Sequence, residues 1–105
     1  MSYDPGALDS ALAAAVGDDS ALQAELRGAF LDSARRQLEG LRHAGGPGDW
    51  RIAAWRLKGL AASFGVTDMM ALSETAADAA PRDPETLRRI ERALAALEQA
   101  HIDAA

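Results

Sequence analysis

The chain has 105 residues, enough for one hydrophobic core, and we expect a single domain over residues 1–105. Hydrophobic residues make up 49% of the chain but aromatic residues only 5%, a composition that favours packed helices over a β-sandwich. The net charge of −5, from 16 acidic and 11 basic residues, excludes a general nucleic-acid binder.

A short first helix is predicted between residues 5–6 and Gly17, a residue type favoured at helix C-termini. Its apolar residues are four positions apart: Leu8, Leu12 and Val16. A long second helix is predicted from Ser20 to about Ala44, with capping residues at 18–20 and a capping box between Ser20 and Gln23. Its apolar residues recur at three or four positions: Leu22, Leu26, Phe30, Ala34, Leu38 and Leu41.

The glycine-rich turn at residues 45–48 ends the second helix, and Asp49 is predicted to cap the third. The core-facing stripe of the third helix is Trp50, Ala54, Leu57, Ala61 and Phe64. Gly65 ends that helix. A fourth helix, capped by Thr67 or Asp68, runs to the turn at residues 80–83 with a core face of small residues.

The last helix is predicted to begin with Asp83 as its cap and Pro84 in its first turn, where proline costs least. Its core stripe is Leu87, Ile90, Leu94, Leu97 and His101. Amphipathic helices joined by short connectors favour an all-α fold. We expect an up-down-up-down four-helix bundle, with the short first helix as an additional cover.

The third helix carries a second tryptophan on the face opposite its core stripe. At about 100° per residue, Trp55 lies about 140° from Trp50. Small and apolar residues share this outer face, and cations border it: Ile52, Gly59 and Ala62, with Arg51, Arg56 and Lys58. The segment between Trp50 and Thr67 contains no acidic residue. A basic, apolar patch on an acidic protein is typical of a docking surface, although Trp55 could instead lie under the N-terminal helix or a loop.

Residues 49–65 resemble the signature of histidine-containing phosphotransfer (HPt) domains, Ala-His-x-Leu-Lys-Gly followed after a few small residues by Gly-Ala. Leu57-Lys58-Gly59 matches this signature directly, and the helix count agrees over nearly the whole chain. The preceding helix, from Phe30 to Ala44, also resembles the second helix of the family. The chain departs from the family at Val66, where alanine is usual, and at residues 76–77, where Leu-Glu is usual.

In the HPt family the histidine of this signature passes a phosphoryl group between histidine kinases and receiver-domain aspartates. The resemblance implies that Lys58 would polarise phosphoryl oxygens and that Gly59 would leave room for the imidazole and the receiver. The histidine position, however, is Trp55. Phosphotransfer needs a ring nitrogen with a free lone pair, and the indole nitrogen is only a donor. Trp55 therefore cannot accept phosphate.

Two histidines remain as alternative acceptors. His43 lies at the end of the second helix without a following Leu-Lys-Gly, and the helix dipole is the ordinary explanation for a histidine there. His101 continues the core stripe of the last helix, which favours a structural role. Neither position carries the signature of a phosphoryl acceptor.

The leading hypothesis is a pseudo-HPt module of a two-component phosphorelay. It would be a monomer that binds the receiver domain of a response regulator, or a histidine kinase, without accepting phosphate. Its partner-binding residues would be Arg51, Ile52, Trp55, Arg56, Lys58, Gly59 and Ala62. The alternatives are an HPt protein phosphorylated on a non-standard histidine and a structural bundle that self-associates through the Trp55 patch.

Other classes are less well supported by the sequence. The absence of cysteine excludes disulfide scaffolds, thiolate metal sites and cysteine nucleophiles. We expect no enzymatic activity, cofactor or metal, because there are no paired carboxylates with a base, no His-x-x-x-His cluster and no glycine-rich phosphate loop. Without an apolar run of roughly 18 residues or a signal peptide, we expect a soluble, cytoplasmic protein that does not bind membranes.

Overall fold

The computed structural model describes residues 6–104 of the chain and the side chains of residues 6–99. Over these residues the protein is all-α, with five helices and no strand, as the sequence predicts. The helices are α1 (Ala7–Val16), α2 (Ser20–Arg42), α3 (Pro47–Ser63), α4 (Thr67–Ala77) and α5 (Pro84–Ala104).

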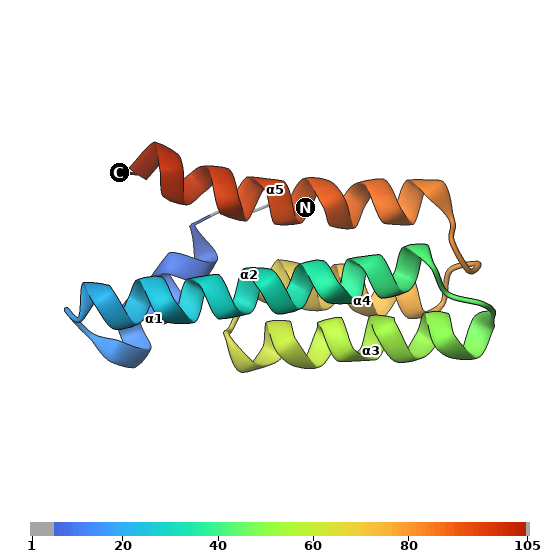
Figure 1. Ribbon diagram of the computed structural model, residues 1–105, viewed down its shortest axis with the longest axis horizontal. Coiled ribbons are helices and arrows are strands. Elements are labelled where there is room, and N and C mark those ends of the chain that lie inside the picture. The colour runs from blue at the N-terminus through green and yellow to red at the C-terminus, as the bar shows by residue number, and fades with distance from the viewer. Residues whose placement is uncertain (1–5, 105) are drawn as a thin grey trace.

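The four longer helices run along the long axis of a molecule that measures 43 × 22 × 18 Å (Figure 1). Helix α3 packs against α2 and α4, and α5 packs against the same two helices. The short α1 packs against α2, near the end of the molecule where α3 finishes (Figure 1). One face of α3 is therefore turned toward α2 and α4, and the opposite face is turned outward.

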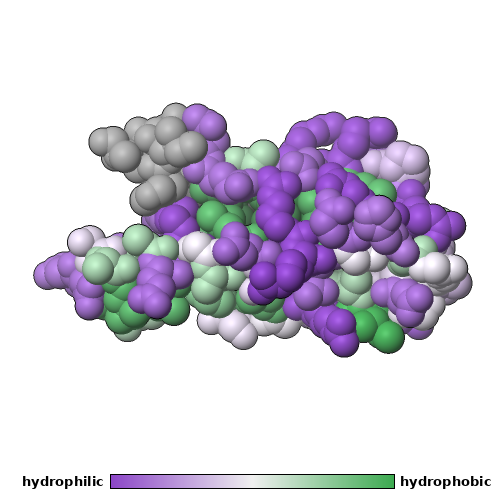
Figure 2. All heavy atoms as spheres, viewed as in Figure 1, coloured by the Kyte–Doolittle hydropathy of each residue, from purple (hydrophilic) through white to green (hydrophobic). Residues whose placement is uncertain are grey.

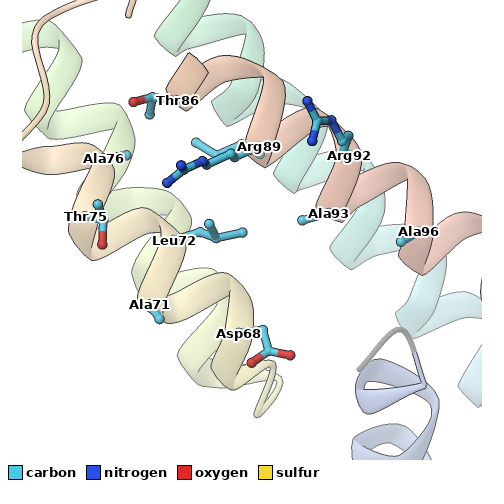
Figure 3. Close-up of a pocket in the computed structure, with 11 residues that line it drawn as sticks. Asp68, Ala71, Leu72, Thr75, Ala76, Thr86, Arg89, Arg92, Ala93 and Ala96 are labelled. Atoms are coloured by element: carbon cyan, nitrogen blue, oxygen red, sulfur yellow. The ribbon is translucent and has the colours of Figure 1, made fainter. Parts of the chain in front are cut away.

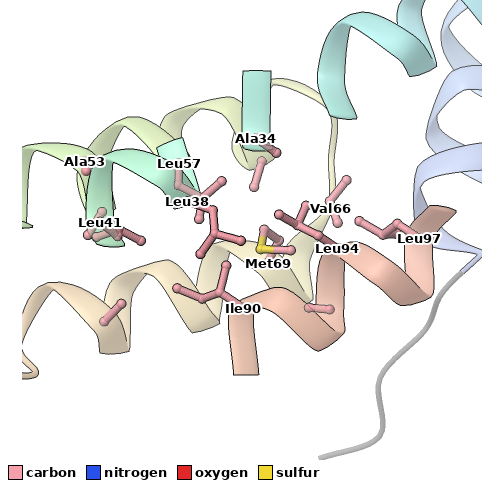
Figure 4. Packing of buried hydrophobic residues seen from close by; sticks show 14 of the residues in the cluster. Ala34, Leu38, Leu41, Ala53, Leu57, Val66, Met69, Ile90, Leu94 and Leu97 are labelled. Atoms are coloured by element: carbon pink, nitrogen blue, oxygen red, sulfur yellow. The ribbon is translucent and has the colours of Figure 1, made fainter. Parts of the chain in front are cut away.

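The core lies between α2, α3, α4 and α5, where large apolar side chains from all four helices meet. Leu38, Leu57, Met69, Ile90 and Leu94 converge there (Figure 4), and each is fully buried. At about 25 cal/mol per Å² of apolar surface, burial of such side chains is the main stabilising contribution to the fold.

The predicted stripes agree with this core, except at the ends of the helices. Four stripe residues of α2 are fully buried, whereas Leu22 is 37% exposed and Leu26 lies at the edge of the core. Phe64 is partly buried and packs on Phe30, with 5.0 Å between ring centroids. His101 lies outside the described side chains.

Two predicted helix starts are confirmed by side-chain caps. The Asp83 carboxylate accepts a hydrogen bond from the Thr86 backbone N–H at 3.0 Å, and the Asp19 carboxylate accepts one from Leu22 at the same distance. Since Asp19 is the cap of α2, the expected capping box from Ser20 does not form. Instead, the Gln23 side chain donates to the Gly17 carbonyl.

Two other predicted caps are wrong. Helix α3 begins at Pro47, before the predicted cap Asp49, because proline is well suited to the first turn and its missing N–H would be unpaired there in any case. The acidic Asp49 lies in that first turn, where it complements the helix dipole. Helix α4 has Val66 as its N-cap and no side-chain cap, so neither Thr67 nor Asp68 has the predicted role.

Glycine has a conformational role at the two chain reversals where it was expected. Gly17 after α1 and Gly65 after α3 have φ of 64° and 68°, a region that other residues adopt only with strain. Arg82, in the turn before α5, also has a positive φ of 59°. Its guanidinium donates to the Ala44 carbonyl, which ties the α4–α5 turn to the α2–α3 turn.

An ion pair anchors α1 to α2, between Asp9 and Arg27. Arg27 is one of only two buried polar side chains among the described residues, and burial lowers the pKa of its guanidinium.

Over the described residues, no helix combines the length and hydropathy needed to cross a membrane.

Helices α2 and α5 are joined by a cluster of ion pairs centred on Glu91. Arg35 Nη1 lies 2.7 Å from both Glu91 carboxylate oxygens, and Arg42 Nη2 lies 2.9 Å from Oε2. Arg35 also pairs with Glu98. The hydrogen bonds from Arg35, and then those from Arg42, hold the pKa of Glu91 below its ordinary value of 4.5.

This lowered pKa predicts a loss of stability in acid. A carboxylate with a lower pKa in the folded chain stabilises the fold fully above about pH 4.5 and loses that contribution as the pH falls through the folded value. Glu91→Gln should therefore be less stable than wild type near neutral pH, with a difference that shrinks as the pH falls to about 3. Urea midpoints measured across this range test the prediction.

Glu25→Gln is the matched control, because Glu25 is an exposed glutamate of α2 without an ion pair to any described residue. We expect its urea midpoint to follow that of wild type at each pH. A Glu91→Gln variant whose deficit stayed constant from neutral pH into acid would show that the ion pairs do not account for the loss.

Candidate functional site

The outward face of α3 carries the most exposed large hydrophobic side chains of the described chain. Ile52 is 50% exposed and Trp55 is 48% exposed, whereas Trp50 on the opposite face is 1% exposed. In Figure 2 hydrophobic surface appears over the N-terminal half of α3, at the lower right, bordered by hydrophilic residues. The alternative in which Trp55 is covered by the N-terminal helix or a loop is therefore wrong.

The other predicted site residues lie on or beside this face. Gly59 and Ala62 are exposed. Arg51 and Arg56 are also exposed, and neither makes an ion pair with another described residue. We call Arg51, Ile52, Trp55, Arg56, Lys58, Gly59 and Ala62 the Trp55 patch. The structure thus brings all seven predicted residues together on one helix.

Lys58, the only lysine of the chain, is held between two neighbours. Its Nζ lies 4.6 Å from the centroid of the Trp55 ring, a cation–π distance, and 3.2 Å from Glu74 Oε2. A cation–π contact at an exposed site contributes about 0.5–1 kcal/mol. Lys58 therefore links the Trp55 ring of α3 to the Glu74 carboxylate of α4.

Glu74 is a residue of the site that the sequence reasoning missed. The face has no acidic residue along α3 itself, but α4 packs beside α3 and places this carboxylate against Lys58. The positive charge of the patch therefore lies mainly on Arg51 and Arg56. Glu74 is 16 residues beyond Lys58 in the sequence, so only the packing of α4 against α3 brings the two side chains together.

Gly59 leaves open space in the middle of the patch. A Cβ atom built at this position would meet nothing within 4 Å, so packing within the chain does not require glycine there. The Gly59 carbonyl accepts a hydrogen bond from Ser63 Oγ at 3.0 Å. A mid-helix glycine costs about 1 kcal/mol relative to alanine, and here the resulting depression lies one turn from the exposed indole.

A hollow of about 400 Å³ adjoins the patch on the side of α2. Ile52 and Arg56 of the patch line it together with residues of α2, including Arg36 and Gly40. The α2 residues were not predicted to belong to the site. The periodicity of α2 indicates which of its residues face the core, but not which residues lie beside α3.

A larger groove of about 760 Å³ lies between α4 and α5, where Leu72 and Arg89 point into the gap (Figure 3). None of the residues of the Trp55 patch lines it. Over the described residues, no group of three or more histidines, cysteines or acidic residues could hold a metal ion.

His43 lies at the C-terminal end of α2 and is exposed. Its Nε2 is 3.3 Å from Glu39 Oε2, one turn earlier in the same helix. It also lines the hollow beside the patch, at the end nearer the α2–α3 turn. The side chain of His101 lies outside the described residues.

Comparisons of the chain with protein-family models, with curated proteins and with solved structures find no match. The functional interpretation therefore rests on the residues of α3 and on the geometry around them.

Proposed function

We propose that the protein is a pseudo-HPt module that binds a receiver domain, or a histidine kinase, through the Trp55 patch without accepting phosphate. In this proposal α2, α3, α4 and α5 form the up-down-up-down bundle of the HPt family, and α1 is the additional cover. The observation that carries it is a 48% exposed tryptophan at the acceptor position, followed after Arg56 by Leu57-Lys58-Gly59.

The chemistry of the patch supports binding rather than transfer. The indole has no lone pair to attack phosphorus, and Lys58 is engaged by Trp55 and Glu74. Tryptophan and arginine are the residue types most often found as interface anchors. Arg51 and Arg56 supply positive charge toward the acidic pocket that receiver domains present, and such complementarity mainly raises association rate and specificity.

Restoring histidine at position 55 tests whether only the acceptor has been lost. The wild-type protein should take no phosphate from phosphorylated receiver domains. Trp55→His should take some, because the imidazole would lie exposed next to Lys58, attack the phosphorus and release the aspartate carboxylate. The measurement is transfer of labelled phosphate from the receiver domains of the same genome, with binding recorded in parallel.

Trp55→Gln is the control, since it offers no nucleophilic nitrogen at the same exposed position. Acid-labile phosphate on the wild-type chain would contradict the proposal and would favour His43 or His101 as the acceptor. Failure of wild type to bind any receiver domain or kinase of the genome would contradict it as well.

The runner-up function is a structural bundle that self-associates through the Trp55 patch, and the same exposed Ile52 and Trp55 support it. Light scattering at high concentration separates the two functions. A monomer leaves the patch free for another protein, whereas a dimer that dissociates on Trp55→Ala would favour the structural bundle.

A further inference from the structure

The hollow between α2 and α3 has two ends of different charge. Gly40 of α2 lies opposite Ala53 of α3, with 3.6 Å between the position of a Gly40 Cβ and the Ala53 Cβ. Arg36 lies one turn before Gly40 in α2, and Arg56 lies about one turn after Ala53 in α3, so both arginines border the same end. This end is next to Trp55.

The opposite end of the hollow, near the α2–α3 turn, contains His43 and Asp49. His43 Nε2 lies 3.3 Å from Glu39 Oε2. The Asp49 carboxylate lies beside Gly45, with Oδ2 3.4 Å from the position that a Gly45 Cβ would take. Asp49, the one acidic residue among those that line the hollow, therefore lies at the end away from the arginines. Arg36 and Arg56 line the end that adjoins the Trp55 patch.

The two arginines at the positive end lack a carboxylate partner among the described residues. Arg36 Nη2 donates to Ser33 Oγ at 3.0 Å, a neutral acceptor that leaves its other donors free. Arg56 makes no ion pair with a described residue. Other arginines of α2 are engaged, since Arg35 and Arg42 both bind Glu91. Arg36 and Arg56 are thus the two arginines of the hollow whose guanidinium groups are available to bind an anion.

Gly40 lines the hollow from α2. An exposed glycine in the second half of α2 has no helix-forming advantage, and its missing side chain leaves the floor open between Ile52 and the arginines. A Cβ at position 40 would lie 3.6 Å from the Ala53 Cβ, an ordinary van der Waals contact, so alanine would fit there without a shift of the helices. The packing of α2 on α3 therefore does not require glycine at position 40, and a larger side chain there would narrow the hollow that Gly40 lines.

We propose that this hollow receives a carboxylate side chain of the protein partner, bound between Arg36 and Arg56 while an apolar side chain of the same partner contacts Ile52 and Trp55. The docking surface then extends from α3 onto α2. This inference rests on the proposed function and specifies the partner: its interface carries an aspartate or glutamate beside its apolar contact. Arginine suits this role because its guanidinium can bind a carboxylate with two hydrogen bonds.

Two variants test the hollow in different ways. Arg36→Glu reverses the charge on α2 without touching the Trp55 patch, and it should weaken binding of the receiver domain that wild type binds by about tenfold at low ionic strength. Its binding should also vary less with salt than that of wild type. Gly40→Leu adds a side chain to the hollow with no change of charge, and it should weaken binding by roughly fivefold or more. Urea unfolding of this variant, measured in parallel, shows whether its fold is kept.

Arg92→Glu is the matched control, an exposed arginine of α5 that lines the other groove and makes no ion pair with a described residue. It should leave the Kd within about twofold of wild type. An equal loss for Arg92→Glu and Arg36→Glu would indicate general electrostatic attraction and overturn the assignment.

The outcomes separate this inference from the proposed function. If Trp55→Ala abolishes binding but Arg36→Glu and Gly40→Leu bind as wild type does, the hollow is not part of the interface and only the inference fails. If wild type binds no receiver domain, the proposed function fails and the inference fails with it. If wild type is a dimer that Arg36→Glu dissociates, the occupant is a second copy of this chain, which also overturns the assignment.

Discussion

Replacing Trp55 by alanine is expected to weaken binding of the proposed receiver-domain partner by about 2 kcal/mol or more, which is roughly a thirtyfold rise in Kd. The indole is 48% exposed and contacts Lys58 at one face, so about half of its surface is available for burial by a partner. The fold should lose about 1 kcal/mol or less, because the variant removes an exposed side chain and one cation–π contact.

Titration calorimetry gives the Kd, and urea unfolding followed by circular dichroism gives the stability. Leu22→Ala is the matched control, since Leu22 is the remaining exposed large hydrophobic residue among those described and lies in the first turn of α2, outside the Trp55 patch. It should bind as wild type does. Equal affinities for wild type and Trp55→Ala would remove Trp55 as the anchor of the interface.

Replacing the other tryptophan should have the opposite effect, with a large loss of stability. Trp50 is 1% exposed, and its Nε1 donates to the Ala76 carbonyl at 2.7 Å, which links α3 to the end of α4. Trp50→Ala removes this hydrogen bond and leaves a cavity in the core. For buried aromatic residues such substitutions cost about 3–5 kcal/mol, a large part of the stability of a small domain.

Trp50→Phe retains most of the ring volume but cannot donate the hydrogen bond, so its cost should fall between those of wild type and Trp50→Ala. Thermal and urea unfolding of the three proteins measure this order. Since the Trp55 patch stays intact, any folded fraction of Trp50→Phe should bind the partner with unchanged Kd. A Trp50→Ala protein as stable as Trp55→Ala would mean that the two faces of α3 have been assigned the wrong way round.

Most of the fold follows from periodicity in the sequence, because burial along a helix repeats every three to four residues. This rule separates Trp50 from Trp55, and the two side chains differ in exposure as predicted. The first residue of a helix is harder to predict from the sequence than its buried face. Proline and glycine at 47–48 read as a break, yet the first turn of a helix needs no backbone donors, so α3 begins at Pro47.

The residues of the site that lie on α3 could be predicted from the sequence. All seven residues of the Trp55 patch follow from the turn angle of α3, whereas Glu74 and Arg36 come from neighbouring helices. Their approach depends on how the helices pack, which the pattern along a single helix does not contain. The periodicity of α2 assigns Arg36 to solvent correctly but does not indicate that α3 lies beside it.

The position of Lys58 has a practical consequence for the chemistry of the chain. Its Nζ is the only lysine amine in the sequence, and it lies 4.6 Å from the Trp55 ring centroid. Amine-reactive dyes, crosslinkers and sensor surfaces that acylate this lysine would attach in the middle of the Trp55 patch. Such a label would block the surface it was meant to report on, while a crosslinker of short reach would join the chain to whatever protein covers that patch.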